Sequence, residues 1–397
     1  MRVIVDKADL IVACKSARPF VPRKSTLPVL HTVRLATPTD NLHIYGTDLD
    51  NTVCVRVSAI VSEPGAVCVP LDVLTSAIAG ISDGDIELVS TDGEMLDVLV
   101  DGKVCASLTG MPSDEFPHLG FADSSPANSA LGFDVSALHG TLERVTPFSS
   151  RDETRPSLCG VALESQSGVG VVFASSDGHR LAAEFLPLNG ADVWPGVGDP
   201  KHIRVYDGAG MRALVKLCKA EARAQKRMDM TSAVLVSEID ASGQGVGRLR
   251  IDFWASDTSV WVRECEGPYP RYAQVRPSEY CGASLDTDTD ALSVAVKAVL
   301  PAANKETHQI VFQMQDRFTR LTACTPGVGE LTQKVRSDGS GVLRVGYNGR
   351  YVLDLCKALP KHAQIVIAPM SESGAALVTS SAVPNFWGLL MPLRIST

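Results

Sequence analysis

The sequence lacks several features that would indicate a class of function directly. It has no run of about 18 apolar residues, the length that a membrane-spanning helix needs. Its start, MRVIVDKADLIVACKSAR, carries Asp6, Lys7 and Asp9 where a secretory signal would need an unbroken apolar stretch. No G-x-x-x-x-G-K-[ST] phosphate loop occurs, and GQGVGR lacks the spacing of a dinucleotide loop. We therefore expect a cytoplasmic protein without a nucleotide cofactor.

Metal-binding motifs are also missing. The ten cysteines are scattered singly, and the absence of any C-x-x-C pair argues against a zinc site or a dithiol redox motif. Most of them lie among aliphatic residues, where a reduced cysteine acts as a small hydrophobe. The stretch DTDTDALSVAVK begins like a calcium loop, but Ala291 replaces the required glycine and Lys297 stands where a bidentate glutamate should be. We expect a helix start there, capped by Thr289 or Asp290, and no cofactor.

No catalytic site can be assembled from the motifs. Asp177 and His179 could be an acid and the base that it orients, but residues two apart need not face each other and no nucleophile is identifiable. The close carboxylates Asp48 with Asp50, and Asp152 with Glu153, fit solvated turns better than ligand sets. We predict a protein that is not an enzyme, and an α+β enzyme with an unrecognised site remains the alternative.

Charge and length narrow the remaining classes. The 397 residues suggest two to four domains, and 45% hydrophobic with 21% charged residues is typical of a folded protein. The formal net charge of -8 argues against a protein that coats nucleic acid over its whole surface. Any contact with nucleic acid must be a segregated basic patch.

One stretch, RALVKLCKAEARAQKR, is a candidate for such a patch. On a helix its cations fall within an arc of roughly 100°, and Leu214, Leu217 and Cys218 point to the other side. Two interpretations stay open for this stripe: a solvated helix face, interrupted by Glu221, or a surface laid against phosphate. The cations are Arg212, Lys216, Lys219, Arg223, Lys226 and Arg227.

Two strand–helix patterns recur along the chain. The first occurs in MRVIVDKADLIVAC, ALGFDVSALHGTLERV and SLDTDTDALSVAVKAVL, whose starts lie about 130 to 155 residues apart, the size of a modest domain. The second occurs in AVCVPLDVLTSAIAG, HIRVYDGAGMRALVKLCKAEARA and VLRVGYNGRYVLDLCKAL. Strand-like runs lie between them, and FADSSPANSA and GPYPRYAQVRPSEY are candidate linkers. The sequence therefore predicts three α+β repeats, each with two helices and antiparallel strands.

Eight collinear segments resemble the bacterial sliding clamp, the beta subunit of DNA polymerase III. They are TLPVLHTVRL (26–35), IYGTDLD (44–50), MPSDEFPHL (111–119), DETRPSLCGVALE (152–164), SSDGHRLA (175–182), PYPRYAQVRP (268–277), GYNGRYVLDLCKAL (346–359) and MPLR (391–394). The resemblance implies three clamp domains, residues 1–125, 130–277 and 278–397. It also implies a head-to-tail homodimer that closes a ring around double-stranded DNA without reading its sequence, and that raises the processivity of DNA replication.

The family resemblance also implies two functional surfaces. The basic stripe would face the central hole, together with Arg23 and Lys24 just before T-L-P. A groove would bind short peptide segments of polymerase, clamp loader and repair proteins. Carried over by position, its residues are Leu158, Ser176, Gly178, His179, Arg180, Leu181, Pro270, Val275, Leu389, Met391, Pro392, Leu393 and Arg394. Without the family, Leu158, Leu181 and Met391 would be read as core.

The sequence departs from the family pattern at three places. Ala273 and Gln274 stand where many relatives have arginine, and residues 395–397 extend past the usual end. Bulky aliphatic residues are partly replaced around Leu300, at the expected subunit contact. These departures motivate an alternative function, a specialised clamp paralogue with altered partners, such as a phage, decoy or inhibitor-tolerant copy.

Overall fold

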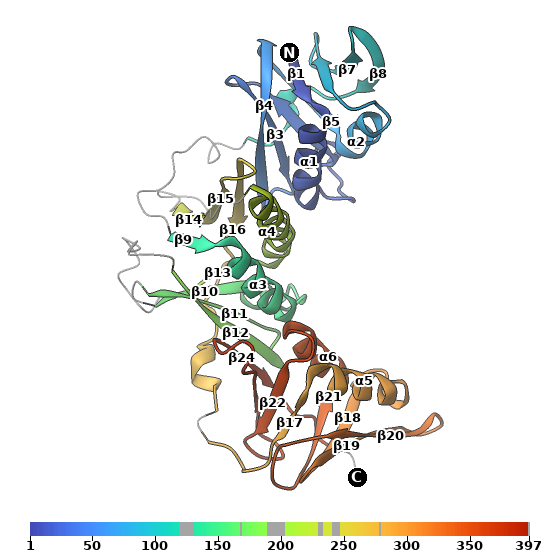
Figure 1. The fold of residues 1–397 in the computed structure, drawn as a ribbon, viewed down its shortest axis with the longest axis vertical. Helices are drawn as coiled ribbons and strands as arrows, with labels where there is room; N and C mark the ends of the chain where they lie inside the picture. The colour runs from blue at the N-terminus through green and yellow to red at the C-terminus, as the bar shows by residue number, and fades with distance from the viewer. Residues whose placement is uncertain are drawn as a thin grey trace. The chain divides into compact units, whose positions relative to one another are not determined.

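The computed structural model describes residues 1–118, 131–166, 169–188, 203–228, 233–239, 247–277 and 279–395, and its ribbon is drawn in Figure 1. Two compact units divide the chain, and α3 (Val135–Val145) crosses the division at Gly140. Among the described residues, no helix is both long and apolar enough to cross a membrane. The expected linker FADSSPANSA lies outside the described residues.

The first unit combines three helices with one antiparallel sheet system. Its helices are α1 (Lys7–Ala17), α2 (Leu71–Ala79) and α4 (Gly208–Met228). Its strands are β1 (Arg2–Asp6), β2 (Thr32–Ala36), β3 (Asn41–Thr47), β4 (Thr52–Glu63), β5 (Ala66–Pro70), β6 (Asp85–Val89), β7 (Met95–Val100), β8 (Lys103–Thr109), β9 (Leu131–Asp134), β14 (Ala233–Ile239), β15 (Arg248–Phe253) and β16 (Thr258–Arg263). The sheet runs β8-β7-β6-β1-β4-β16-β15-β14-β9, with β2, β3 and β5 joined to it through β3–β4 pairing.

The second unit contains α5 (Thr289–Val299) and α6 (Gly349–Ala358), which pack side by side (Figure 1). An eight-stranded sheet runs β13-β10-β11-β12-β24-β23-β22-β17 and a four-stranded sheet runs β20-β19-β18-β21. The strands are β10 (Gly160–Gln166), β11 (Gly170–Ser176), β12 (Arg180–Pro187), β13 (Ile203–Asp207), β17 (Leu285–Asp288), β18 (Gln309–Gln315), β19 (Phe318–Thr325), β20 (Gly329–Arg336), β21 (Leu343–Asn348), β22 (Gln364–Pro369), β23 (Ala376–Thr379) and β24 (Phe386–Leu390).

All of the predicted strand–helix patterns are present. The first pattern corresponds to β1–α1, β9–α3 and β17–α5, and the second to β5–α2, β13–α4 and β21–α6. The predicted cap of α5 was wrong: Asp288, not Thr289 or Asp290, accepts the backbone N–H groups of Asp290 and Ala291. Asp6 caps α1 in the same way, because both strands end in an aspartate whose extended backbone turns its side chain toward the first helical turn. The predicted α+β class is confirmed.

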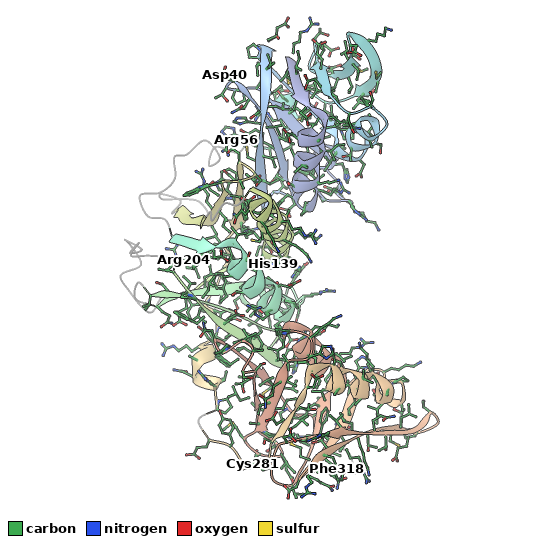
Figure 2. The ribbon with its side chains drawn as sticks, viewed as in Figure 1. Asp40, Arg56, His139, Arg204, Cys281 and Phe318 are labelled. Atoms are coloured by element: carbon green, nitrogen blue, oxygen red, sulfur yellow. The ribbon has the colours of Figure 1, made fainter. Side chains whose placement is uncertain are left out.

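Strand pairing joins neighbouring repeats within each unit. In the first unit β4 pairs with β16, from Thr52↔Trp261 to Val55↔Thr258. Arg56, labelled in Figure 2, lies at this seam and its guanidinium is 3.2 Å from the carboxylate of Asp257. In the second unit β12 pairs with β24, from Arg180↔Leu390 to Glu184↔Phe386. The boundaries of the three predicted domains, which fall near 125–130 and 277–278, stay predictions.

A buried ion pair fixes α3 to β12 in the second unit. Arg144 donates two hydrogen bonds to the carboxylate of Glu184, at 2.6 and 2.5 Å, and Thr141 donates a third at 2.9 Å. The side chain of Glu184 is only 6% exposed, so its charge is matched by a bidentate partner rather than by water. Next to it, a core that includes Leu292, Phe312 and Tyr347 fills the space beneath α5 and α6.

The cysteines differ in exposure, and Cys159 and Cys265 are half-buried. Cys14, Cys54, Cys68, Cys218 and Cys356 are buried, whereas Cys105, Cys281 and Cys324 are exposed. Burial raises the thiol pKa of Cys14 to about 12 and those of Cys54, Cys68 and Cys356 to about 11, and it raises that of Cys218 as well. The thiolate, which is the reactive form, is therefore scarce in the buried set.

We predict that brief treatment with iodoacetamide at pH 8 alkylates Cys105, Cys281 and Cys324 and leaves the buried cysteines unmodified. Both burial and raised pKa protect the buried thiols. Peptide mass spectrometry measures the modification, and the same treatment in urea should label every cysteine. Alkylation of Cys54 or Cys218 as fast as that of Cys105 would show that the core is not packed as described.

Candidate functional site

The helix α4 separates its cations from its packed face. Arg212, Lys216, Lys219, Arg223 and Lys226 are exposed. Met211, Leu214, Leu217 and Cys218 are at most 5% exposed and anchor the opposite side. At a rise of 1.5 Å per residue, the stripe from Arg212 to Lys226 is about 21 Å long on a helix of 21 residues. Arg227 lies in the helix, but its side chain is outside the described residues.

The sequence suggested that Glu221 interrupts this stripe, but the structure shows that it does not. It is 2% exposed on the packed side of α4, where its Oε1 accepts the backbone N–H of Ala255 at 2.8 Å. Gln225, one turn later, is also buried and donates to the same oxygen at 3.5 Å. Nine residues separate Glu221 from Arg212, and nine steps of about 100° place it on the opposite face of the helix. The exposed stripe is therefore purely cationic among the described side chains.

Arg23 and Lys24 are exposed in a loop of the first unit. The loop lies between two short 3₁₀ helices, Arg18–Phe20 and Pro28–His31. Pro22 precedes them, and its carbonyl oxygen lies 3.0 Å from Nδ1 of His31. The loop therefore presents two adjacent cations to solvent.

A cavity of about 300 Å³ lies within the second unit. It is lined by Leu158, Ser176, Gly178, His179, Arg180, Leu181, Tyr269, Pro270, Arg271, Tyr272, Val275, Ala375, Leu389 and Met391. The walls are mostly aliphatic and aromatic, and their floor continues into a buried cluster that contains Leu158, Leu181 and Leu389. The structure thus brings together every predicted groove residue except Pro392, Leu393 and Arg394.

The pairing of β12 with β24 builds one wall of this cavity. Leu181 lies opposite Leu389, and beyond the last ladder pair the N–H of Met391 donates to the carbonyl of His179 at 2.9 Å. The turn into β12 needs a glycine, because Gly178 has a φ of +89° and a Cβ there would approach Arg155 to 3.1 Å. Asp177 stabilises the turn by accepting the N–H groups of His179 and Arg180 at 2.9 and 3.0 Å.

The side chain of Arg180 is held inside the unit by two carboxylates and is not free to bind a ligand. Its guanidinium donates to Asp177 at 3.0 Å and to Asp354 at 2.5 Å. It also lies 4.6 Å from the ring centre of Tyr351, and burial together with Asp177 raises the phenol pKa of that tyrosine. Only 10% of the arginine side chain is exposed. Arg180 therefore serves as a structural brace of the cavity wall.

The predicted linker GPYPRYAQVRPSEY supplies another wall and is not a free connection. Tyr269 and Tyr272 are 6% and 4% exposed, with ring centres 6.3 Å apart. The hydroxyl of Tyr272 donates to Glu164, and burial followed by that bond raises its pKa above the usual range. Burial likewise raises the pKa of Tyr269. Between the two tyrosines Arg271 is exposed at the edge of the cavity.

Tyr269, Arg271, Tyr272 and Ala375 line the cavity but were not predicted. The first three flank Pro270 within a motif that the sequence already singled out, so their neighbourhood was a usable signal. Ala375 precedes β23 and carries no motif. Pro392, Leu393 and Arg394 lie elsewhere because the chain turns after Met391: the N–H of Leu393 donates to Gly346 on β21 at 2.8 Å.

One group of side chains has the composition of a metal site. Asp288, Asp290 and His362 place one potential ligand atom each within 4.8 Å of one another, and no other such group occurs among the described residues. Asp288 already caps α5, and the imidazole of His362 lies 3.2 Å from the carboxylate of Asp290 at the surface. Capping and a surface ion pair account for these residues, so we assign no metal to them.

Comparisons with known proteins agree with the sequence resemblance. Residues 1–120 match the family model described as the N-terminal domain of the DNA polymerase III beta subunit. The chain is 25% identical to the beta sliding clamp of Caulobacter vibrioides and 26% identical to that of Chlamydia pneumoniae, with 100% of this chain and at least 99% of each relative covered. A crystal structure of the DNA polymerase III subunit beta from Pseudomonas aeruginosa superposes with a TM-score of 0.84 at 22% identity, with both chains fully covered. The predicted clamp fold is confirmed.

We predict that Arg180→Ala lowers the free energy of unfolding by about 3 kcal/mol, because it leaves the carboxylates of Asp177 and Asp354 without their buried partner. Arg271→Ala is the matched control, since it removes the same charge from the same cavity at an exposed position, and it should change stability by no more than about 0.5 kcal/mol. Urea unfolding followed by tryptophan fluorescence gives both values. Equal small losses would contradict the bracing role of Arg180.

Proposed function

We propose that the chain belongs to the family of the bacterial DNA polymerase III beta subunit and that it is a DNA sliding clamp. Two copies associate head to tail into a ring that surrounds double-stranded DNA and tethers the replicative polymerase. The role is non-catalytic and is carried out in the cytoplasm. The single observation that carries the proposal is the uninterrupted cationic face of α4 in a protein of net charge -8.

The α4 stripe is the proposed DNA-facing surface. Lys216, Lys219 and Arg223 occupy successive turns of one helix face, and Arg23 and Lys24 add two cations from the same unit. Cations that contact only phosphates bind duplex DNA without regard to sequence. Such contacts exchange readily, so a ring that is linked topologically to DNA can move along it.

Head-to-tail closure requires two different edges on each copy, and the chain has them. The edge strand β8 belongs to the first unit and the edge strand β20 to the second. Most residues of both strands are exposed, so their outer backbone groups are open to a new antiparallel partner. Pairing of β8 in one copy with β20 in the next would be a heterologous contact of the type that builds closed rings.

The cavity of the second unit is the proposed docking site for partner proteins. Its size and its aliphatic and aromatic walls suit one or two apolar side chains of a short peptide. Exposed Met391 and Val275 lie at its edge, whereas Leu158, Leu181 and Leu389 form its buried floor. Peptide segments of polymerase, clamp loader and repair proteins are the proposed ligands. A shared docking site would let these partners use the clamp in turn.

Replacing Lys216, Lys219 and Arg223 together with glutamate should weaken duplex DNA binding and reduce its salt dependence. Each lost phosphate contact removes about 0.9 from the slope of log affinity against log salt, so the slope should fall by about 3. Fluorescence anisotropy with a labelled duplex, titrated from low to moderate salt, measures both quantities.

The matched control replaces three exposed lysines that lie outside α4 and outside the proposed edge strands, Lys297, Lys305 and Lys361, with glutamate. This control changes the net charge by the same amount, so it separates a local contact from a general loss of charge. An unchanged slope in the α4 variant, or an equal fall in both variants, would mean that α4 does not contact DNA.

A further inference from the structure

The outer face of the four-stranded sheet in the second unit carries a row of cations. Arg344 on β21 lies opposite Gln313 on β18, Gln313 lies opposite Arg320 on β19, and Arg320 lies opposite Lys334 on β20. Directly opposed residues of an antiparallel sheet point to the same side. The three cations are exposed, so the row stands on the solvent face, over about 14 Å at the usual strand spacing of about 4.8 Å.

The next row along the strands also contains a glutamine and an arginine. Gln315 lies opposite Phe318 and Phe318 lies opposite Arg336. Phe318, labelled in Figure 2, is half-buried at the start of β19, and the ammonium of Lys334 lies 5.0 Å from its ring centre. On the other side of the cation row, Thr322 and Thr332 lie opposite each other with their hydroxyls 3.2 Å apart. These rows carry arginine, lysine, glutamine and threonine around one aromatic ring. The same face also holds Val311 opposite Thr322 and, one row further, Glu330 opposite Cys324.

The charges on this face are not neutralised within the sheet. No aspartate or glutamate stands in either row. Among the described residues the side chains of Arg320 and Arg344 have no ion pair or hydrogen bond, and that of Arg336 has only a surface contact of 3.7 Å with Asp338. Arg320 directly opposes Lys334, and like charges placed opposite each other destabilise a sheet. A repulsive pair in a protein of net charge -8 indicates that this face meets an anion.

We propose that the outer face of β18–β21 binds a single strand of DNA. Phosphates are recognised by arginine, lysine, threonine and glutamine side chains, and all four occur on the face. A folded protein or a peptide would require a cluster of apolar anchors, which the two rows lack. A flat sheet with one aromatic ring among cations fits unpaired bases better than a duplex, because bases can stack only when they are exposed.

This surface is separate from the α4 stripe, which lies in the other unit. The choice of DNA over RNA rests on the proposed clamp function. The inference that this face binds an anion rests only on the residues of the sheet. In a clamp, the inference assigns the unpaired template strand next to the primer end as the ligand. Single-strand binding to the sheet and duplex binding to α4 can then be lost independently.

The decisive variant is Lys334→Glu in the full-length protein. It places a carboxylate opposite Arg320, so it should raise the melting temperature while it weakens binding of a labelled oligothymidylate of about twelve nucleotides by about tenfold or more. The triple variant R320Q/K334Q/R344Q should lower the salt slope for the oligonucleotide by about 2, at about 0.7 for each phosphate contact. Lys361→Gln, an exposed lysine outside the sheet, is the control and should leave the affinity unchanged.

Anisotropy of the labelled oligonucleotide measures these affinities, and differential scanning fluorimetry measures the melting temperatures. If Lys334→Glu should fail to fold, the triple variant decides the question. Unchanged affinity in the decisive variant overturns the inference, and so does stronger competition by polyglutamate than by unlabelled oligothymidylate, which would indicate an acidic protein partner. Tighter binding of oligouridylate would overturn the choice of DNA. If the α4 variant loses single-strand binding and the sheet variants keep it, both single-strand and duplex binding belong to α4 and the inference is overturned.

Discussion

The antiparallel pairing of β12 with β24 is the contact on which the second unit depends. These strands are separated by some 200 residues of sequence, and the register Leu181↔Leu389 builds a wall of the cavity that neither segment could form alone. The pairing also places the side chain of Arg180. Arg180 is the first residue of β12, and its guanidinium bonds to both Asp354 of α6 and Asp177 of the preceding turn.

The same kind of pairing organises the first unit, where β4 is shared by three neighbouring strands, β1, β3 and β16. Through β4, the strands of the first unit form one continuous sheet system. The helix α4 differs from the other helices of this unit because its exposed charged side chains are all cations. Even its buried polar residues, Glu221 and Gln225, are turned inward and hydrogen-bonded, which leaves the exposed face to cations. The cationic face of α4 therefore originates in the way that this helix packs.

Periodicity predicted the elements well, because each helix follows a strand and carries its own apolar stripe. The stripe of α4 could be read from positions 212–226 alone for the same reason. The cap of α5 was misplaced by one or two residues, since Asp288, Thr289 and Asp290 are all competent caps and only the end of β17 decides between them. Leu158, Leu181 and Leu389 entered the predicted groove through family resemblance, because nothing local tells a cavity wall from a core residue.

Contacts between residues far apart in the chain could not be predicted from the sequence. The bracing of Arg180 depends on Asp354, which lies 174 residues away, so local sequence could not predict this contact. Pro392, Leu393 and Arg394 were predicted in the groove by their position after Met391, but the chain turns there to pair with Gly346. The cation row across β18–β21 was equally invisible, since Arg344, Arg320 and Lys334 become neighbours only through strand register. Such features require the pairing of strands to be known.

The central claim is that this protein is held on DNA by encirclement rather than by affinity. The most direct measurement loads the protein onto closed circular plasmid with a bacterial clamp loader and follows its retention by gel filtration as salt is raised. The account predicts that protein stays with circular DNA at salt concentrations that abolish binding to short duplexes, and that a single cut by a restriction enzyme releases it. Equal loss from circular and linear DNA at every salt concentration would contradict the account.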